Sequence, residues 1–105
     1  MDLPTYSFLA QKTDKYYPEI KDRLINAAMG LSGEAGEVVE HIKKVYYQDQ
    51  PFNREKVVEE LGDVLWYVDK MRREVGASWE EIMDGNIGKL SRRYEKGRYE
   101  AVERE

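Results

Sequence analysis

The sequence contains no cysteine, one histidine and only three prolines, and it has no long run of apolar residues. Without cysteine the chain forms neither disulfides nor cysteine-ligated zinc sites. No apolar run near the N-terminus is long enough for a signal peptide, and no segment is long enough to cross a membrane. We therefore expect a cytoplasmic protein without disulfides or membrane spans.

Positive charge is also scarce, with 17 lysines and arginines against 21 acidic residues. The resulting net charge of -4 argues against a general binder of nucleic-acid polymers. Charged residues make up 36% and hydrophobic residues 41% of the 105 residues, which is enough for one domain with a modest core. We expect residues 1–105 to form a single domain with a charged, helical surface.

Apolar residues recur every three or four positions, which predicts helices rather than strands. Four helices are expected, at about residues 6–13, 22–47, 54–75 and from residue 78 to about 96. Thr5, Asn53 and Ser78 are the expected N-caps, and Gly76 is the expected C-cap.

The short turn at 48–53 makes the two long helices antiparallel, so their apolar stripes should face each other. The predicted fold is an all-α helical bundle built on these two helices. A single thin hairpin cannot bury both stripes, and Trp66 should face another helix or a partner subunit, so the pattern is compatible with a bundle completed by oligomerisation. The residues expected to face inward are Leu24, Ala28, Leu31, Ala35, Val38, Ile42 and Val45; Val57, Leu61, Val64, Val68, Met71 and Val75; and Trp79, Ile82, Met83, Ile87 and Leu90.

Two acidic pairs, Glu34 with Glu37 and Glu60 with Asp63, each have a three-residue spacing. At 100° per residue both pairs lie on the same rotational flank of their helices, and antiparallel packing brings such flanks to one face. Glu37 and Asp63 also lie at matching heights, roughly 13–15 Å above the turn. Four carboxylates at one level suit Mg²⁺ or Mn²⁺. From geometry alone, a metal site and a solvated acidic flank stay equally open.

His41 is the one histidine, and it does not complete the Glu-x-x-His pattern that a di-iron carboxylate site needs on two helices. We expect it to be a surface residue or to lie just outside any metal ligands. Asn86, Lys89 and Arg93 follow one another at helical spacing, and cations there would suit a polyphosphate. By themselves these three residues favour an ordinary charged flank.

Three glycines, Gly30, Gly33 and Gly36, occur in the stretch GLSGEAGE, where each costs about 1 kcal/mol of helix propensity. We expect Gly30 and Gly33 to leave room beside the acidic pair and Gly36 to make a helix-packing contact. A local break at residues 30–32 stays open.

Three segments together resemble the MazG-like all-α nucleoside triphosphate pyrophosphohydrolases. These segments are GLSGEAGEVVEHIKK at 30–44, EELGDVLWYV at 59–68 and NIGKLSRRY at 86–94. The family pattern is Glu-x-x-Glu, a spacer, Glu-x-x-Asp, and then a segment like Asn-x-x-Lys-Leu-x-x-Arg-Tyr. Residues 6–13 also look like the family's first helix, so the resemblance covers most of the chain.

The resemblance implies hydrolysis of a nucleoside triphosphate, with a deoxynucleotide favoured, between its α- and β-phosphates. The products would be the monophosphate and pyrophosphate, and the task would be nucleotide-pool control or removal of abnormal nucleotides. It implies Mg²⁺, with Mn²⁺ as a substitute, and Glu37 as the carboxylate that orients the attacking water. The implied metal ligands are Glu34, Glu37, Glu60 and Asp63.

The resemblance also implies a substrate site and an assembly. Lys44, Lys89 and Arg93 would hold the polyphosphate, and Asn86 would bind the sugar or a phosphate. Tyr67 would meet the sugar or base, or simply pack; the two stay equally open. The chain carries a single set of metal motifs, as in the short family members, which implies a homodimer or homotetramer.

A catalytically silent helical oligomerisation module is the main alternative to an enzyme. A chorismate mutase-like enzyme is disfavoured because its site would need clustered arginine and lysine, whereas the clustered groups here are acidic. The sequence leaves the base and sugar preference open.

Overall fold

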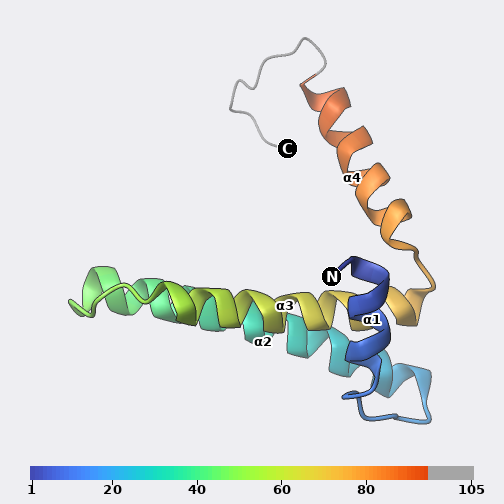
Figure 1. Ribbon diagram of the computed structural model, residues 1–105, viewed down its shortest axis with the longest axis horizontal. Helices are drawn as coiled ribbons and strands as arrows, with labels where there is room; N and C mark the ends of the chain where they lie inside the picture. Colours follow the sequence, from blue (N-terminus) through green and yellow to red (C-terminus); the bar gives the residue numbers. More distant parts are fainter. Residues whose placement is uncertain (95–105) are drawn as a thin grey trace.

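The computed structural model describes residues 1–94, which form four helices and no strand. They are α1 (Leu3–Gln11), α2 (Ile20–Tyr47), α3 (Arg54–Val75) and α4 (Trp79–Arg93). The long helices α2 and α3 lie side by side as an antiparallel hairpin, α1 lies across the end of α3, and α4 leads away from the hairpin (Figure 1). The expected all-α architecture is confirmed, and the end of the fourth predicted helix, at residues 95–96, lies outside the described residues.

The start of α1 differs from the prediction. The helix begins at Leu3, and its N-cap is Asp2, whose Oδ1 accepts a hydrogen bond from the backbone N–H of Thr5 at 2.9 Å. The prediction of Thr5 as the cap was therefore wrong. Pro4 lies in the first turn, where its missing N–H leaves no intrahelical bond unmade.

The ends of α3 and the start of α4 agree with the prediction. Asn53 Oδ1 accepts from the N–H of Lys56 at 3.1 Å, and Ser78 Oγ accepts from the N–H of Glu81 at 3.0 Å. Gly76 ends α3 with a φ of 72°, in the left-handed region that favours glycine. These caps are local signals, which explains why the sequence alone locates them.

The face of α2 that meets α3 is rotated from the predicted stripe. Ala27 is completely buried, whereas the predicted Ala28, Ala35 and Ile42 are exposed. The physical reason is the close approach at Gly30, where an added Cβ would overlap the ring of Tyr67 on α3. The close approach is local to Gly30 and Ala27, and the predicted Leu24, Leu31, Val38 and Val45 remain half-buried.

Other predicted core residues, on α3 and α4, are exposed as well. On α3, Leu61 and Val75 face solvent. On α4, Trp79 is buried and Leu90 is half-buried, whereas the other expected apolar residues are exposed. The inward orientation expected for Ile82, Met83 and Ile87 is wrong within this chain, because α4 does not fold back onto the hairpin.

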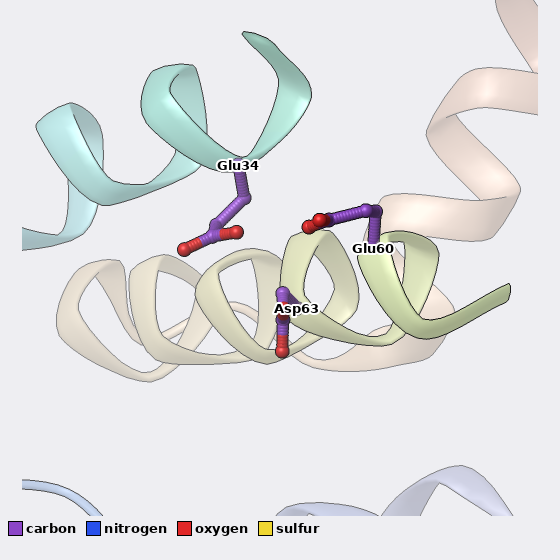
Figure 2. Close-up of side chains that lie close together, drawn as sticks. All are labelled: Glu34, Glu60 and Asp63. Atoms are coloured by element: carbon purple, nitrogen blue, oxygen red, sulfur yellow. The ribbon is translucent and has the colours of Figure 1, made fainter. Parts of the chain in front are cut away.

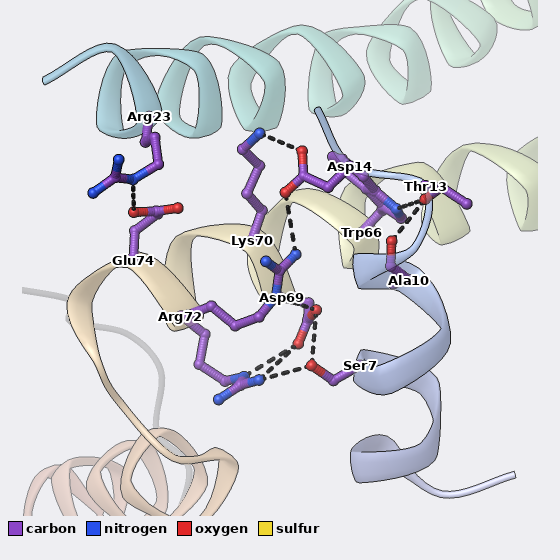
Figure 3. A network of polar contacts seen from close by, with 11 residues as sticks. Ser7, Ala10, Thr13, Asp14, Arg23, Trp66, Asp69, Lys70, Arg72 and Glu74 are labelled. Atoms are coloured by element: carbon purple, nitrogen blue, oxygen red, sulfur yellow. Dashed lines mark hydrogen bonds and ion pairs between the residues drawn. The ribbon is translucent and has the colours of Figure 1, made fainter. Parts of the chain in front are cut away.

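Buried charges hold α1 against α3 (Figure 3). Asp69 is completely buried and accepts hydrogen bonds from Ser7 Oγ on α1 at 3.1 Å and from Arg73 Nε at 3.1 Å. Lys70 is only 2% exposed, and its Nζ lies 2.6 Å from Asp14 Oδ1, just beyond α1. Since buried charges are costly without partners, these pairs fix where α1 and the segment after it lie.

Gly30 and Gly33 offer a matched test of the close helix approach. Gly30→Ala should destabilise the protein by about 1–3 kcal/mol, because Tyr67 has to move. Gly33→Ala should stabilise it by up to about 1 kcal/mol, because a Cβ there meets nothing within 4 Å in this chain and alanine favours helix. Urea unfolding measures both changes. Equal stabilisation by the two substitutions would show that α2 and α3 do not approach closely at Gly30.

Candidate metal centre

Three carboxylates converge between α2 and α3. Glu34, Glu60 and Asp63 each offer an oxygen, and these oxygens lie within 4.8 Å of one another. Figure 2 shows Glu34 reaching from α2 toward α3, which carries Glu60 and Asp63. Glu60 is buried, Glu34 is half-buried and Asp63 is exposed, so the group opens to solvent on one side.

The separation of these oxygens fits a hard divalent cation. Opposite ligands of an octahedral Mg²⁺ ion lie about 4.2 Å apart, which is twice the Mg–O distance of about 2.1 Å. Small side-chain rotations that move each oxygen by well under 1 Å would bring oxygens spread over 4.8 Å to that distance. Water would complete the coordination on the exposed side, as Mg²⁺ prefers.

The electrostatics of the group favour a bound cation. Partial burial raises the pKa of Glu34 above its usual value of 4.5, and the charges of Asp63, Glu60 and Glu37 raise it further. The ionised carboxylates therefore repel one another at neutral pH. A divalent cation would remove this repulsion.

Lys56 supplies a partial counter-charge that the sequence analysis missed. Its Nζ lies 3.1 Å from Glu60 Oε2, one turn away on α3. Glu60 holds the pKa of Lys56 above its ordinary value, through a side-chain hydrogen bond and through its charge. The four-residue spacing of Lys56 and Glu60 was the available signal.

Glu37 lies outside the converging group. It is exposed and one turn beyond Glu34 on α2, so it borders the three carboxylates without joining them. Its charge nevertheless contributes to the raised pKa of Glu34. The structure thus unites three of the four carboxylates that the sequence analysis placed together.

A pocket of about 330 Å³ opens beside the carboxylates. Trp66 and Tyr67 meet edge to face there, with ring centroids 4.9 Å apart and planes at 76°. Trp66 Nε1 donates a hydrogen bond to Thr13 Oγ1 at 2.9 Å. Trp66 thus contacts the segment after α1, whereas packing against a helix or a partner subunit was expected, and its place in the pocket was not foreseen. The pocket is lined by Thr13, Glu34, Asp63, Trp66 and Tyr67.

His41 and Lys44 lie near the turn between α2 and α3. His41 Nε2 accepts from the backbone N–H of Asn53 at 3.1 Å, and its ring lies 5.6 Å from that of Phe52. His41 therefore secures the turn. Lys44 is ten residues beyond Glu34, or roughly 15 Å along the helix, so the structure does not bring it to the carboxylates.

The remaining predicted substrate residues are on α4. Asn86, Lys89 and Arg93 lie on exposed positions of this helix. Because α4 leads away from the hairpin, this chain does not bring them to its own carboxylates (Figure 1).

Comparison with known proteins decides the family. A model of the MazG nucleotide pyrophosphohydrolase domain matches residues 24–97, which include all three converging carboxylates. The chain belongs to the MazG nucleotide pyrophosphohydrolase family.

The MazG-family chain is also similar to a curated phage protein. It is 34% identical over 73 residues to the Gene 37 protein of Mycobacterium phage L5, covering 66% of this chain and 64% of the phage protein. The chain thus matches just under two thirds of the length of that relative. No solved structure matches this chain. Within residues 1–94, no helix combines the length and apolar character needed to span a membrane.

The raised pKa of Glu34 predicts a pH-dependent stability difference. A carboxyl group whose pKa is raised on folding stabilises the folded state at low pH, and this stabilisation is lost as pH rises through the folded-state pKa. Without metal, Glu34→Gln should therefore be more stable than the unchanged protein at pH 7, and the difference should shrink as pH falls toward the usual value of 4.5.

Urea unfolding of both proteins in EDTA, from pH 7 to pH 5, measures this difference. The same measurement with excess Mg²⁺ should reverse the order at pH 7, because the cation binds the carboxylate. A stability difference that stays constant with pH in EDTA would contradict the repulsion among these carboxylates.

Proposed function

We propose that this protein is a Mg²⁺-dependent nucleotide pyrophosphohydrolase. It would hydrolyse a nucleoside triphosphate, preferably a deoxynucleotide, between the α- and β-phosphates and release the monophosphate and pyrophosphate. The observation that carries this proposal is the convergence of Glu34, Glu60 and Asp63 within 4.8 Å, in a chain of the MazG family. Its cellular task would be control or cleaning of the nucleotide pool.

The three converging carboxylates would hold Mg²⁺, with Mn²⁺ as a substitute. When bound, the cation supplies charge neutralisation at the phosphoryl oxygens and lowers the pKa of a bound water. Glu37 would orient that water; its exposed position on α2, one turn beyond Glu34, supports this role. Positioning and charge stabilisation are most of what phosphoryl transfer requires of a protein.

Lys56 is better placed than Lys44 to contact the polyphosphate. In the structure Lys56 pairs with Glu60, and its ammonium group would contact the polyphosphate when Glu60 holds a cation. Tyr67 lines the pocket beside Asp63 and would contact the sugar or base. Lys44 would need to act on a longer or differently oriented ligand.

We further propose that residues 1–105 are one domain that assembles as a homodimer or homotetramer. Within residues 1–94 the buried hydrophobic residues are only Ala10, Ala27 and Trp79, which is a very small core. Large apolar residues remain exposed along α2, α3 and α4 and would pack between copies. They include Ile25, Met29, Val39, Ile42, Val58, Leu61, Ile82, Met83 and Ile87. In such an assembly, α4 of a second copy would bring Asn86, Lys89 and Arg93 to the carboxylates.

Turnover of the eight common nucleoside and deoxynucleoside triphosphates tests the proposed reaction. With Mg²⁺ or Mn²⁺ the protein should release pyrophosphate and the monophosphate from at least one of them, and EDTA should abolish this release. Absence of turnover with both metals would favour the silent oligomerisation module.

Glu37→Gln and Glu40→Gln form a matched pair on α2. Glu37→Gln should lower kcat by at least about 100-fold, in the range of a lost acid–base group. Glu40→Gln should leave kcat unchanged, because within residues 1–94 Glu40 forms a solvent-accessible ion pair with Lys43 at 3.7 Å and lies outside the carboxylate group. Circular dichroism checks that both variants keep their helical content. Equal losses in the two variants would contradict the assigned role of Glu37.

A further inference from the structure

We propose that Trp66 forms the wall on which the nucleobase of the substrate stacks. The inference rests on the proposed pyrophosphohydrolase function and adds a residue that sequence reasoning had assigned to packing alone. Trp66 is only half-buried and lines the same pocket of about 330 Å³ as Glu34 and Asp63. An aromatic ring in contact with the carboxylate pocket is available to a ligand bound there.

The position of Trp66 along α3 suits a nucleotide. Asp63 and Trp66 are three residues apart, so their Cβ atoms lie roughly 5–6 Å from each other on one side of the helix. In a nucleotide the sugar separates the base from the α-phosphate. A phosphate at the carboxylates would therefore place its base about one helical turn away, beside Trp66.

The ring of Trp66 is held in place before any ligand binds. Its Nε1 donates to Thr13 Oγ1 at 2.9 Å, and the Thr13 hydroxyl donates to the backbone oxygen of Ala10 at 2.7 Å. The Nζ of buried Lys70 lies over the ring, 5.6 Å from its centroid, while bound to Asp14. An indole ring held in this way can stack with a base without the entropic cost of ordering a mobile side chain.

The contacts of Trp66 also indicate what kind of recognition it offers. Its single N–H is already bonded to Thr13, so the indole can meet a base only through the ring face opposite Lys70 and not through a hydrogen bond. Stacking on a ring face tolerates every base. Trp66 should therefore favour nucleotides over base-free polyphosphates without choosing among bases.

Isothermal titration calorimetry with Mg²⁺ and the α,β-methylene analogues of dATP, dCTP, dGTP and dTTP tests this role, with inorganic tripolyphosphate as the base-free ligand. Trp66→Ala should weaken binding of each nucleotide that the unchanged protein binds by about 5- to 150-fold, the range expected for one stacked base. Affinity for tripolyphosphate should stay within about 2-fold of its original value.

Trp66→Phe separates stacking from a structural role for the Thr13 hydrogen bond. Phenylalanine keeps a stacking face but cannot donate to Thr13, so this variant should keep nucleotide affinity within about 5-fold of the original, as befits a loss near 1 kcal/mol. Tyr46→Ala, which removes an exposed aromatic residue of α2 outside the pocket, should leave all affinities unchanged.

The outcomes distinguish this inference from the proposed function. If the unchanged protein neither binds nor hydrolyses any nucleotide, both are overturned. If it binds and hydrolyses nucleotides but Trp66→Ala leaves their affinity unchanged, only the stacking role fails. If Trp66→Ala and Trp66→Phe weaken nucleotide and tripolyphosphate equally, Trp66 is a structural clamp and the stacking role is likewise overturned.

Discussion

The close approach of α2 and α3 at Gly30 is the contact on which the carboxylate site depends. The ring of Tyr67 occupies the space that a Cβ of residue 30 would fill. One turn further along α2, this approach brings the carboxylate of Glu34 within 4.8 Å of those of Glu60 and Asp63. A wider helix spacing would separate Glu34 from Glu60 and Asp63, which are neighbours on α3. The glycine that weakens the helix thus allows the helix pair to bring three carboxylates together.

Buried ion pairs and hydrogen bonds hold α1 and α3 together, where apolar contacts do so in other small domains. Asp69 and Lys70 are more deeply buried than most of the hydrophobic residues in 1–94, and both bind partners on or just after α1. These contacts fix the segment that carries Thr13, which in turn orients Trp66 at the pocket. The burial of charge next to α1 is therefore linked, through two hydrogen bonds or ion pairs, to the shape of the candidate nucleotide site.

The sequence predicted those features that local chemistry determines. The bounds of α3 and the caps at Asn53, Gly76 and Ser78 follow from single residues, and the convergence of Glu34 with Glu60 and Asp63 follows from helical geometry and a short turn. The rotation of the α2 face was not predictable from hydrophobicity, because a glycine contact decides it.

The failures at the two ends of the chain have different causes. Asp2 and Thr5 were both acceptable caps by residue type. The hydrogen bond from the backbone N–H of Thr5 to the Asp2 carboxylate decides between them. The direction of α4 depends on what its apolar residues pack against, and its helical pattern carries no information on whether that surface belongs to the same chain. The pairing of Lys56 with Glu60 was missed because many i,i+4 charge pairs on exposed helices contribute little.

The claim that the three carboxylates form a metal site is tested most directly by Mn²⁺ binding, followed by electron paramagnetic resonance of the free ion. Asp63→Asn should weaken Mn²⁺ binding at least about tenfold, because a neutral amide replaces a charged ligand. Glu59→Gln removes an exposed acid next to Glu60 but outside the group, and it should leave binding unchanged. Equal Mn²⁺ affinity in the unchanged protein and Asp63→Asn, or an equal loss in both variants, would contradict a metal site at these carboxylates.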